Sequence, residues 1–383
     1  MPRDGPQKWV LVEPLPRDRY PLNIRAADLV QQMMSAKMHR ADAIFVVNPF
    51  DEVSSLMNPN GTPGELLLPW CTTALMLSGT EYLGSIRMPK GSQNHIFTRD
   101  GEAIMVVWND RPTQEVIFLG TDVRQVDIWR RLTKPEMEEH RQVIPIGRFP
   151  TFITGVSEPV ARWRMKVKFK HARMPSVFGK SHRNALELHN YFKQGVNSEI
   201  RITLPSSWRI DQPRIKLKLS AGETREKPFE VRLPIDASGG LQDVRIDFEM
   251  TVDQPYQFSV YRDLEVGLGD VTMEVSTRID DDNMLIVEQR ITNISDKVMD
   301  FKCLLYAPNR RRQRNQVFRL ARGQDVKLYY YPNGRELVGE SLWLRAEEIN
   351  GQRILNHRFT VEKQSRRDRR PEQAVAPFRQ ASD

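Results

Sequence analysis

The chain has 383 residues, enough for two to four domains that each bury a core. Hydrophobic residues make up 39% of it and charged residues 28%, which is typical of globular proteins and excludes a mainly disordered chain. The formal net charge is +8, and residues 162–193 carry nine Lys or Arg against one acidic residue. The positive charge is therefore concentrated in one stretch, which indicates contact with an anionic surface.

The N-terminal residues 1–90 predict a short α/β segment. Residues 9–15 form an apolar run that ends in proline, as in a buried parallel strand. Apolar residues then recur at helical spacing after Asn23, a candidate N-cap, and residues 43–47 form a second apolar strand. Strand, helix and strand in this order predict a βαβ unit with parallel pairing. Because the chain begins almost directly in a strand, we expect it to be the latter part of a longer protein.

Residues 65–84 predict a second helix that ends at Gly84. From about residue 85 the apolar residues recur at strand spacing, and residues 91–170 predict a small antiparallel β-sandwich. Its last strand is expected over residues 161–170, where apolar and basic residues alternate. The basic face of this strand would comprise Arg162, Arg164, Lys166, Lys168 and Lys170.

The remaining residues predict two further sandwiches. Residues 171–187 are polar and are expected to be a linker. Short alternating strands separated by Gly, Pro and Ser turns follow over 188–263 and again over 264–362. Residues 363–383 are charged and proline-bearing, which predicts a disordered basic tail. The predicted fold class is therefore mainly β, with tandem immunoglobulin-like antiparallel β-sandwiches preceded by a short α/β segment.

Two stretches resemble known families. Residues 204–240, from LPSSWRI through AGETREKPFEVRLPIDASGG, are similar to the immunoglobulin-like domain associated with carbohydrate-binding modules of bacterial α-galactosidases. Residues 1–165 resemble the junction at which the (β/α)8 barrel, or TIM barrel, of a retaining glycosidase gives way to a small β-sandwich. In that resemblance residues 9–15 are strand seven and residues 41–51 are strand eight. It implies the C-terminal part of a bacterial glycoside-hydrolase-like protein, at the cell surface or secreted.

Glu13 is the residue that this resemblance places where such barrels carry a catalytic nucleophile, since their active-site groups lie at the carboxyl ends of strands. Retaining hydrolysis needs two carboxyl groups about 5 Å apart, and the partner would come from an earlier strand than those present. We therefore expect a non-catalytic accessory region, acting as a spacer and as a polysaccharide-binding or partner-binding module. The alternative is a retaining glycosidase that a separate barrel chain completes and that uses Glu13.

Aromatic side chains are the candidates for stacking on sugar rings. A second alternative is a polyanion-binding protein that uses the basic strand face, because cations about 6.6 Å apart match a repeating negative polymer. Nucleic acid is disfavoured as a ligand, since Trp163 and Phe169 would lie on the opposite face of that strand. The aromatic candidates are Trp208, Tyr329, Tyr330, Tyr331 and Trp343.

Other kinds of site find no support in the sequence. The two cysteines and seven histidines lack metal-ligand spacing, and no phosphate-binding or dinucleotide-binding glycine pattern occurs. No apolar run approaches the ~20 residues of a membrane span, and no secretory signal is recognisable at the start. We expect no metal, no nucleotide, no other cofactor and no membrane span, and the sequence does not identify the compartment.

Overall fold

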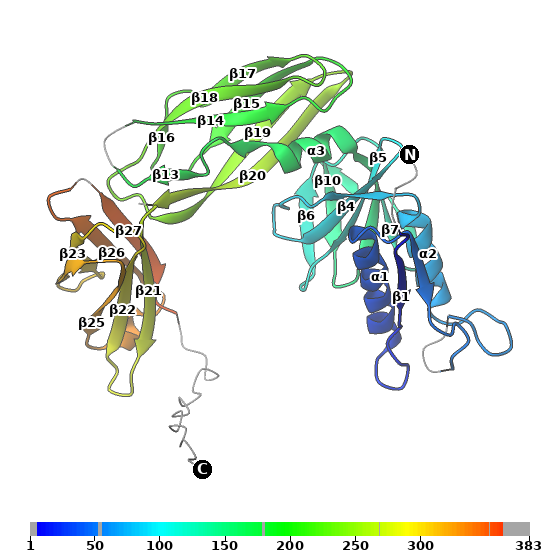
Figure 1. Ribbon diagram of the computed structural model, residues 1–383, viewed down its shortest axis with the longest axis horizontal. Coiled ribbons are helices and arrows are strands. Elements are labelled where there is room, and N and C mark those ends of the chain that lie inside the picture. The colour runs from blue at the N-terminus through cyan, green and yellow to red at the C-terminus, as the bar shows by residue number, and fades with distance from the viewer. Residues whose placement is uncertain (1–5, 53–55, 178–180, 268, 352, 363–383) are drawn as a thin grey trace, which may run out of the picture.

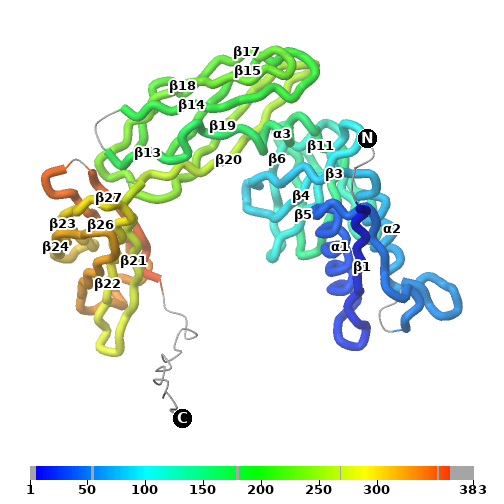
Figure 2. The backbone as a smooth tube through the Cα atoms, in the orientation of Figure 1, coloured from blue at the N-terminus to red at the C-terminus, as the bar shows by residue number. Residues whose placement is uncertain are grey.

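The computed structural model describes residues 6–52, 56–177, 181–267, 269–351 and 353–362, and the predicted tail over 363–383 lies outside them. The chain is mainly β and is built of antiparallel immunoglobulin-like sandwiches after a short α/β segment, which confirms the predicted fold class. Figure 1 shows a middle sandwich with the N-terminal unit at one end and the final sandwich at the other. The same arrangement is visible along the backbone tube in Figure 2. Among the described residues, none of the helices combines the length and the hydrophobicity of a membrane span.

The predicted βαβ unit is confirmed. Strand β1 (Trp9–Val12) pairs in parallel with β2 (Ala43–Val46), and helix α1 (Leu22–Met38) connects them. The helix begins after Pro21 without a side-chain cap, so the predicted cap at Asn23 is wrong. Within the described residues β1 and β2 pair only with each other, and one face of the pair packs on the helices.

The strands of this unit are less buried than their apolar sequence predicts. Trp9 and Leu11 are each 67% exposed, because only one face of β1 is covered. Helix α2 (Leu67–Leu77) is also shorter than predicted. It ends before Gly79, which has a φ of +68°, and Glu81–Gly84 is strand β3 rather than helix.

A small sandwich follows. One of its sheets has the strand order β3-β4-β5-β11-β7-β8 and the other has the order β6-β10-β9. Ile96, Met105, Ile144 and Ile153 come from both sheets and are fully buried between them. The strands are β4 (Gln93–Arg99), β5 (Glu102–Trp108), β6 (Thr113–Ile117), β7 (Arg124–Asp127), β8 (Leu132–Thr133), β9 (Glu136–Glu138), β10 (Arg141–Ile146) and β11 (Thr151–Ser157).

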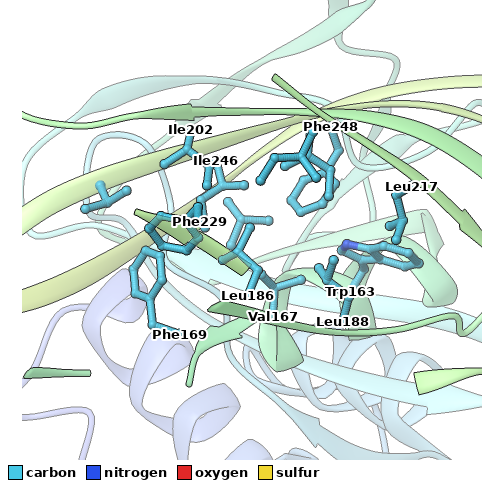
Figure 3. Packing of buried hydrophobic residues seen from close by; sticks show 14 of the residues in the cluster. Trp163, Val167, Phe169, Leu186, Leu188, Ile202, Leu217, Phe229, Ile246 and Phe248 are labelled. Carbon is cyan, nitrogen blue, oxygen red and sulfur yellow. The ribbon is translucent and has the colours of Figure 1, made fainter. Parts of the chain in front are cut away.

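The predicted basic strand is mostly a helix. Glu158–Lys166 is helix α3, and only Lys168–Phe169 is a strand, β12. The buried residues Val160, Trp163 and Val167 are three and four positions apart, which is helical spacing hidden inside an alternating pattern. Trp163 enters the core of the middle sandwich near Leu188 and Leu217 (Figure 3). A continuous basic strand face over residues 162–170 therefore does not form.

The middle sandwich begins inside the predicted linker. Strand β13 (Arg173–Pro175) and most of β14 (Ser181–His189) lie in 171–187, and β14 pairs with β18 along its whole length. These residues are therefore part of the sandwich rather than a linker, because Met174 and Leu186 are buried in its core. The remaining strands are β15 (Val196–Thr203), β16 (Arg209–Ile210), β17 (Arg214–Leu219), β18 (Thr224–Arg232), β19 (Gly240–Thr251) and β20 (Pro255–Gly267).

Two sheets make up the middle sandwich. The first has the order β12-β14-β18-β16, and the second, here called the groove sheet, has the order β13-β20-β19-β15-β17. Phe229 from the first sheet and Ile246 and Phe248 from the groove sheet fill the core between them (Figure 3). The outer side of the groove sheet faces away from this core and carries polar and charged side chains.

The final sandwich has its own core around Phe301, Leu305 and Tyr329. Its sheets have the orders β21-β22-β25 and β24-β23-β26-β27. The strands are β21 (Val271–Ile279), β22 (Leu285–Asn293), β23 (Met299–Tyr306), β24 (Gln313–Leu320), β25 (Gly323–Tyr331), β26 (Ser341–Glu348) and β27 (Ile354–Thr360).

Candidate functional site

A groove lies between the small sandwich and the outer side of the groove sheet. Two cavities there, of about 640 and 860 Å³, share lining residues and so adjoin each other. Each volume is within the range of ordinary ligand pockets, about 300–1,000 Å³. We call this feature the interdomain groove. The residues that line both cavities are Phe118, His140, Glu199, Glu249 and Gln257.

The alternation of side chains along strands builds the floor of the groove. On β15, Ile200 and Ile202 are buried in the core, so the intervening residues Glu199 and Arg201 project outward. The neighbouring strands β19 and β20 repeat this pattern in register. Aligned rows of outward residues result, and one row runs Arg214, Arg201, Asp247, Ser259 across four strands.

Most of the arginines on the floor and rim are paired with acidic residues. Arg245 Nε lies 2.7 Å from Asp247 Oδ1, and Arg214 Nη1 lies 3.4 Å from Glu199 Oε1. At the rim, Arg141 is paired with Glu139. These pairs leave carboxylates, guanidinium groups and amides along the floor, a surface rich in hydrogen-bonding groups.

Arg164 of helix α3 reaches the groove from below and is only 4% exposed. Its Nε donates to the carbonyl of Ser259 at 3.1 Å and its Nη1 donates to the carbonyl of Phe118 at 2.5 Å. The guanidinium carbon lies 5.3 Å from the centre of the Phe258 ring. Among the described residues no carboxylate forms an ion pair with Arg164. Burial disfavours the charged form and lowers the pKa of this side chain to about 9.

The other predicted cations are dispersed. Arg162 is paired with Glu158 on its own helix, Lys168 with Glu187, and Lys170 with Glu226. Hydrogen bonds to these carboxylates raise the pKa of Lys168 and of Lys170. Lys166 is exposed at the end of α3. Of the five basic residues, the structure places Arg164 alone in the lining of the groove, and as a buried residue rather than part of an exposed stripe.

The aromatic candidates fall in separate places. Trp208 lies in the core of the middle sandwich, and Tyr329 and Tyr331 lie in the core of the final one, so their rings are not presented to a ligand. Tyr330 is 48% exposed on β25. Trp343 is half-buried and stacks on Tyr306, with ring centres 5.0 Å apart. None of these side chains lines the interdomain groove.

Glu13 is exposed just beyond the end of β1 and does not line the groove. Its backbone is held by Gln32, which accepts from the Glu13 amide and donates to the Glu13 carbonyl. In the described part of the chain no cluster of three His, Cys, Asp or Glu side chains suits a metal ion. Cys303 is buried and Cys71 is exposed, and both are free thiols.

The sequence reasoning missed the groove itself. The alternation of charged and apolar residues in 199–202 and 245–250 predicts an outward polar face, and that signal is present. It does not show that the small sandwich, an earlier part of the chain, covers this face. The groove forms because the small sandwich packs against the outer side of the groove sheet.

Comparisons with known proteins assign no family to the chain. No family model matches the chain, and no curated protein matches it. A transglutaminase from red sea bream is 11% identical with a TM-score of 0.23, over 52% of this chain and 31% of that protein, so less than a third of the transglutaminase is spanned. The YadV chaperone is 12% identical with a TM-score of 0.20, over 51% of this chain and 100% of the chaperone. A DUF4785 family protein from Legionella pneumophila is 10% identical with a TM-score of 0.20, over 74% and 88%. These are distant likenesses to β-sandwich proteins.

Proposed function

We propose that this chain is a non-catalytic accessory region of a glycoside-hydrolase-like protein that binds a polysaccharide in the interdomain groove. The single observation that carries the proposal is the groove, whose two cavities of about 640 and 860 Å³ adjoin along the groove sheet. Two adjoining cavities, each large enough for a ligand, suit a chain-like ligand better than one compact molecule. The final sandwich extends the chain away from the groove and serves as a spacer.

The lining of the groove matches the chemistry of sugars. Pyranose rings present hydroxyl groups at their edges and C–H groups on their faces. The charged floor and Gln257 offer donors and acceptors to the hydroxyl groups. Tyr261 and Met137 line the groove as well, are at least partly exposed, and offer apolar surface to the ring faces. The resemblance of residues 204–240 to a domain that accompanies carbohydrate-binding modules supports the same ligand class.

Binding of the chain to a panel of polysaccharides by affinity electrophoresis tests this proposal. The exposed Gln257 lines both cavities, so Gln257→Ala should weaken binding about fivefold to tenfold, the effect of one lost hydrogen bond. The matched control is Gln324→Ala, an exposed glutamine on β25 of the final sandwich, which should leave binding unchanged. Absence of binding across the panel, or equal effects of the two variants, would overturn the proposal.

A second candidate function is favoured by a face of β1 and β2 that the described residues leave exposed. Trp9, Leu11 and Phe45 are exposed there, and the Trp9 and Phe45 ring centres lie 5.5 Å apart. Parallel strands normally lie in larger sheets that are covered on both faces. We propose that further parallel strands of a (β/α)8 barrel cover this pair in a complete retaining glycosidase that uses Glu13.

Co-expression tests this second candidate. The chain would be produced with the product of the reading frame that precedes its own, and hydrolysis of aryl glycosides would be measured. Turnover that Glu13→Gln abolishes, and that neither chain shows alone, would support it. Turnover that is absent, or that Glu13→Gln leaves intact, would exclude it.

A further inference from the structure

The guanidinium of Arg164 is buried, and none of the described carboxylates serves as its counter-ion. Its described partners are two neutral carbonyl groups and the face of the Phe258 ring. Buried charges in proteins are ordinarily paired, because removing an ion from water is costly. An anion that enters the groove beside Arg164 would supply a counter-ion. Burial away from water also lowers the pKa of the Arg164 guanidinium.

Arg201 is a second cation without an ion pair among the described residues. It is exposed on the floor, and its direct cross-strand neighbour on β17 is Arg214, another cation. Like charges directly opposite each other destabilise a sheet. Arg214 reaches Glu199 at 3.4 Å, which leaves the Arg201 guanidinium facing the groove.

Arg201 and Arg164 both line the same end of the groove. Arg201, Asp247 and Ser259 are in register on adjacent strands, and Arg164 donates to the Ser259 carbonyl. Strand spacing puts the Arg201 and Ser259 backbones about 10 Å apart, within the combined reach of two arginine side chains.

The acidic residues nearby do not neutralise this end. Asp247 lies between the two arginines in the row, but its Oδ1 accepts from Arg245 Nε at 2.7 Å and from Ser259 Oγ at 2.6 Å. Glu199 is paired with Arg214. Glu249 is one row further along the floor, where it faces both cavities. The groove therefore has a cationic end in the cavity of about 640 Å³.

We infer that the groove binds an acidic polysaccharide, with a carboxylate or sulfate group of the polymer held by Arg164 and Arg201. This inference rests on the proposed function and narrows its ligand class. Guanidinium groups bind both anions through paired charge-assisted hydrogen bonds, so the two chemistries share the same site.

Isothermal titration of the full chain with three polymers tests the inference. Polygalacturonate carries carboxylates, dextran sulfate carries sulfates, and dextran is neutral. One or both acidic polymers should bind at least about tenfold more tightly than dextran, the size of one charge-assisted hydrogen bond. The stronger of the two identifies the anion.

Three variants test whether the acidic polymer binds at Arg164 and Arg201 or is attracted to positive charge anywhere on the protein. Arg201→Gln removes an exposed cation that opposes Arg214, so the fold should be kept while the acidic polymer binds about tenfold more weakly. Arg164→Lys keeps the charge but not the forked geometry and should also weaken it. The control is Arg209→Gln, an exposed arginine on β16 in the opposite sheet, which should change binding little.

The outcomes distinguish this inference from the proposed function. Equal binding of acidic and neutral polymers, or equal effects of Arg201→Gln and Arg209→Gln, would overturn the anionic ligand. If dextran or another neutral polymer then still bound and Gln257→Ala weakened it, the proposed function would stand. Absence of all binding would overturn both.

Discussion

The backbone of Gly155 passes so close to Asp122 that a Cβ atom on residue 155 would lie 2.0 Å from the Asp122 carbonyl oxygen. Gly155 also has a φ of +72°, which side chains other than glycine rarely adopt. Its own carbonyl would meet a Cβ on Gly120, which lines the groove, at 2.2 Å. This crossing of two backbones fixes the edge of the small sandwich that forms the groove wall.

Gly155→Ala should therefore destabilise the protein by about 2 kcal/mol or more, since both overpacking and left-handed strain act at this position. Urea denaturation followed by tryptophan fluorescence measures the change. Gly147→Ala is the matched control, because a Cβ there has no neighbour within 4 Å, and it should stay within about 0.5 kcal/mol of the wild type. Equal stabilities of the two variants would contradict the close approach.

The hydroxyl of Tyr329 donates a 2.5 Å hydrogen bond to Gln289 Oε1 in the core of the final sandwich. Both side chains are essentially buried, and burial raises the pKa of Tyr329. Tyr329→Phe leaves the Gln289 oxygen without this donor and should cost about 1–3 kcal/mol. Thermal unfolding measures it, with the exposed Tyr330→Phe as a control that should change stability by less than about 0.5 kcal/mol. A Tyr329→Phe protein as stable as the control would refute this role.

The tyrosine trio shows what the sequence predicts well. Residues that alternate along a strand face opposite sides, and Tyr330 is exposed while Tyr329 and Tyr331 are buried. Alternation also predicts the succession of sandwiches, and apolar runs on either side of a helical repeat predict the βαβ unit. Alternation does not indicate which side of the strand faces the core. Here the buried side carries Tyr329 and Tyr331, two of the candidates for stacking on sugars.

Helix α3 and the groove show where local patterns are insufficient. Val160, Trp163 and Val167 fit a helix, while the alternating residues between 161 and 170 fit a strand equally well. Packing of Trp163 against Phe248, with ring centres 5.7 Å apart, accompanies the helix, and this contact spans 85 residues of sequence. The groove likewise results from contacts between the small sandwich and the middle sandwich, and the residue pattern of a single strand does not predict such contacts.

The Arg353 guanidinium gives the final sandwich a pH-dependent contact. It holds Glu348 at 2.5 Å and Asp270 at 3.0 Å, and the bond to Arg353 lowers the pKa of Glu348 below its ordinary value of 4.5. A carboxyl group with a lowered pKa in the folded state stabilises the protein above pH 4.5, and this stability is lost as pH falls through the folded-state pKa.

Glu348→Gln should therefore be less stable than the wild type at pH 7, and the difference should shrink below about pH 4.5. Urea midpoints measured in steps between pH 7 and pH 3 provide the check. Glu340→Gln, at an exposed position, is the control. Its difference in stability from the wild type should stay the same across these pH values. A Glu348→Gln difference that is constant across this range would show that the ion pair does not contribute.

Asn356 of β27 connects the final sandwich to the middle one through hydrogen bonds. Its Nδ2 donates to the carbonyls of Ile235 and Ala237 at 3.1 and 3.0 Å, and its Oδ1 accepts from Trp343 Nε1 at 3.1 Å. Because Asn356 is only 1% exposed, Asn356→Ala leaves these groups without partners, at a cost of about 1–3 kcal/mol. Hydrogen exchange of the amides near residues 235–240 should become faster, whereas Asn315→Ala on β24 should leave it unchanged. Unchanged exchange in the Asn356 variant would mean that other contacts hold the two sandwiches together.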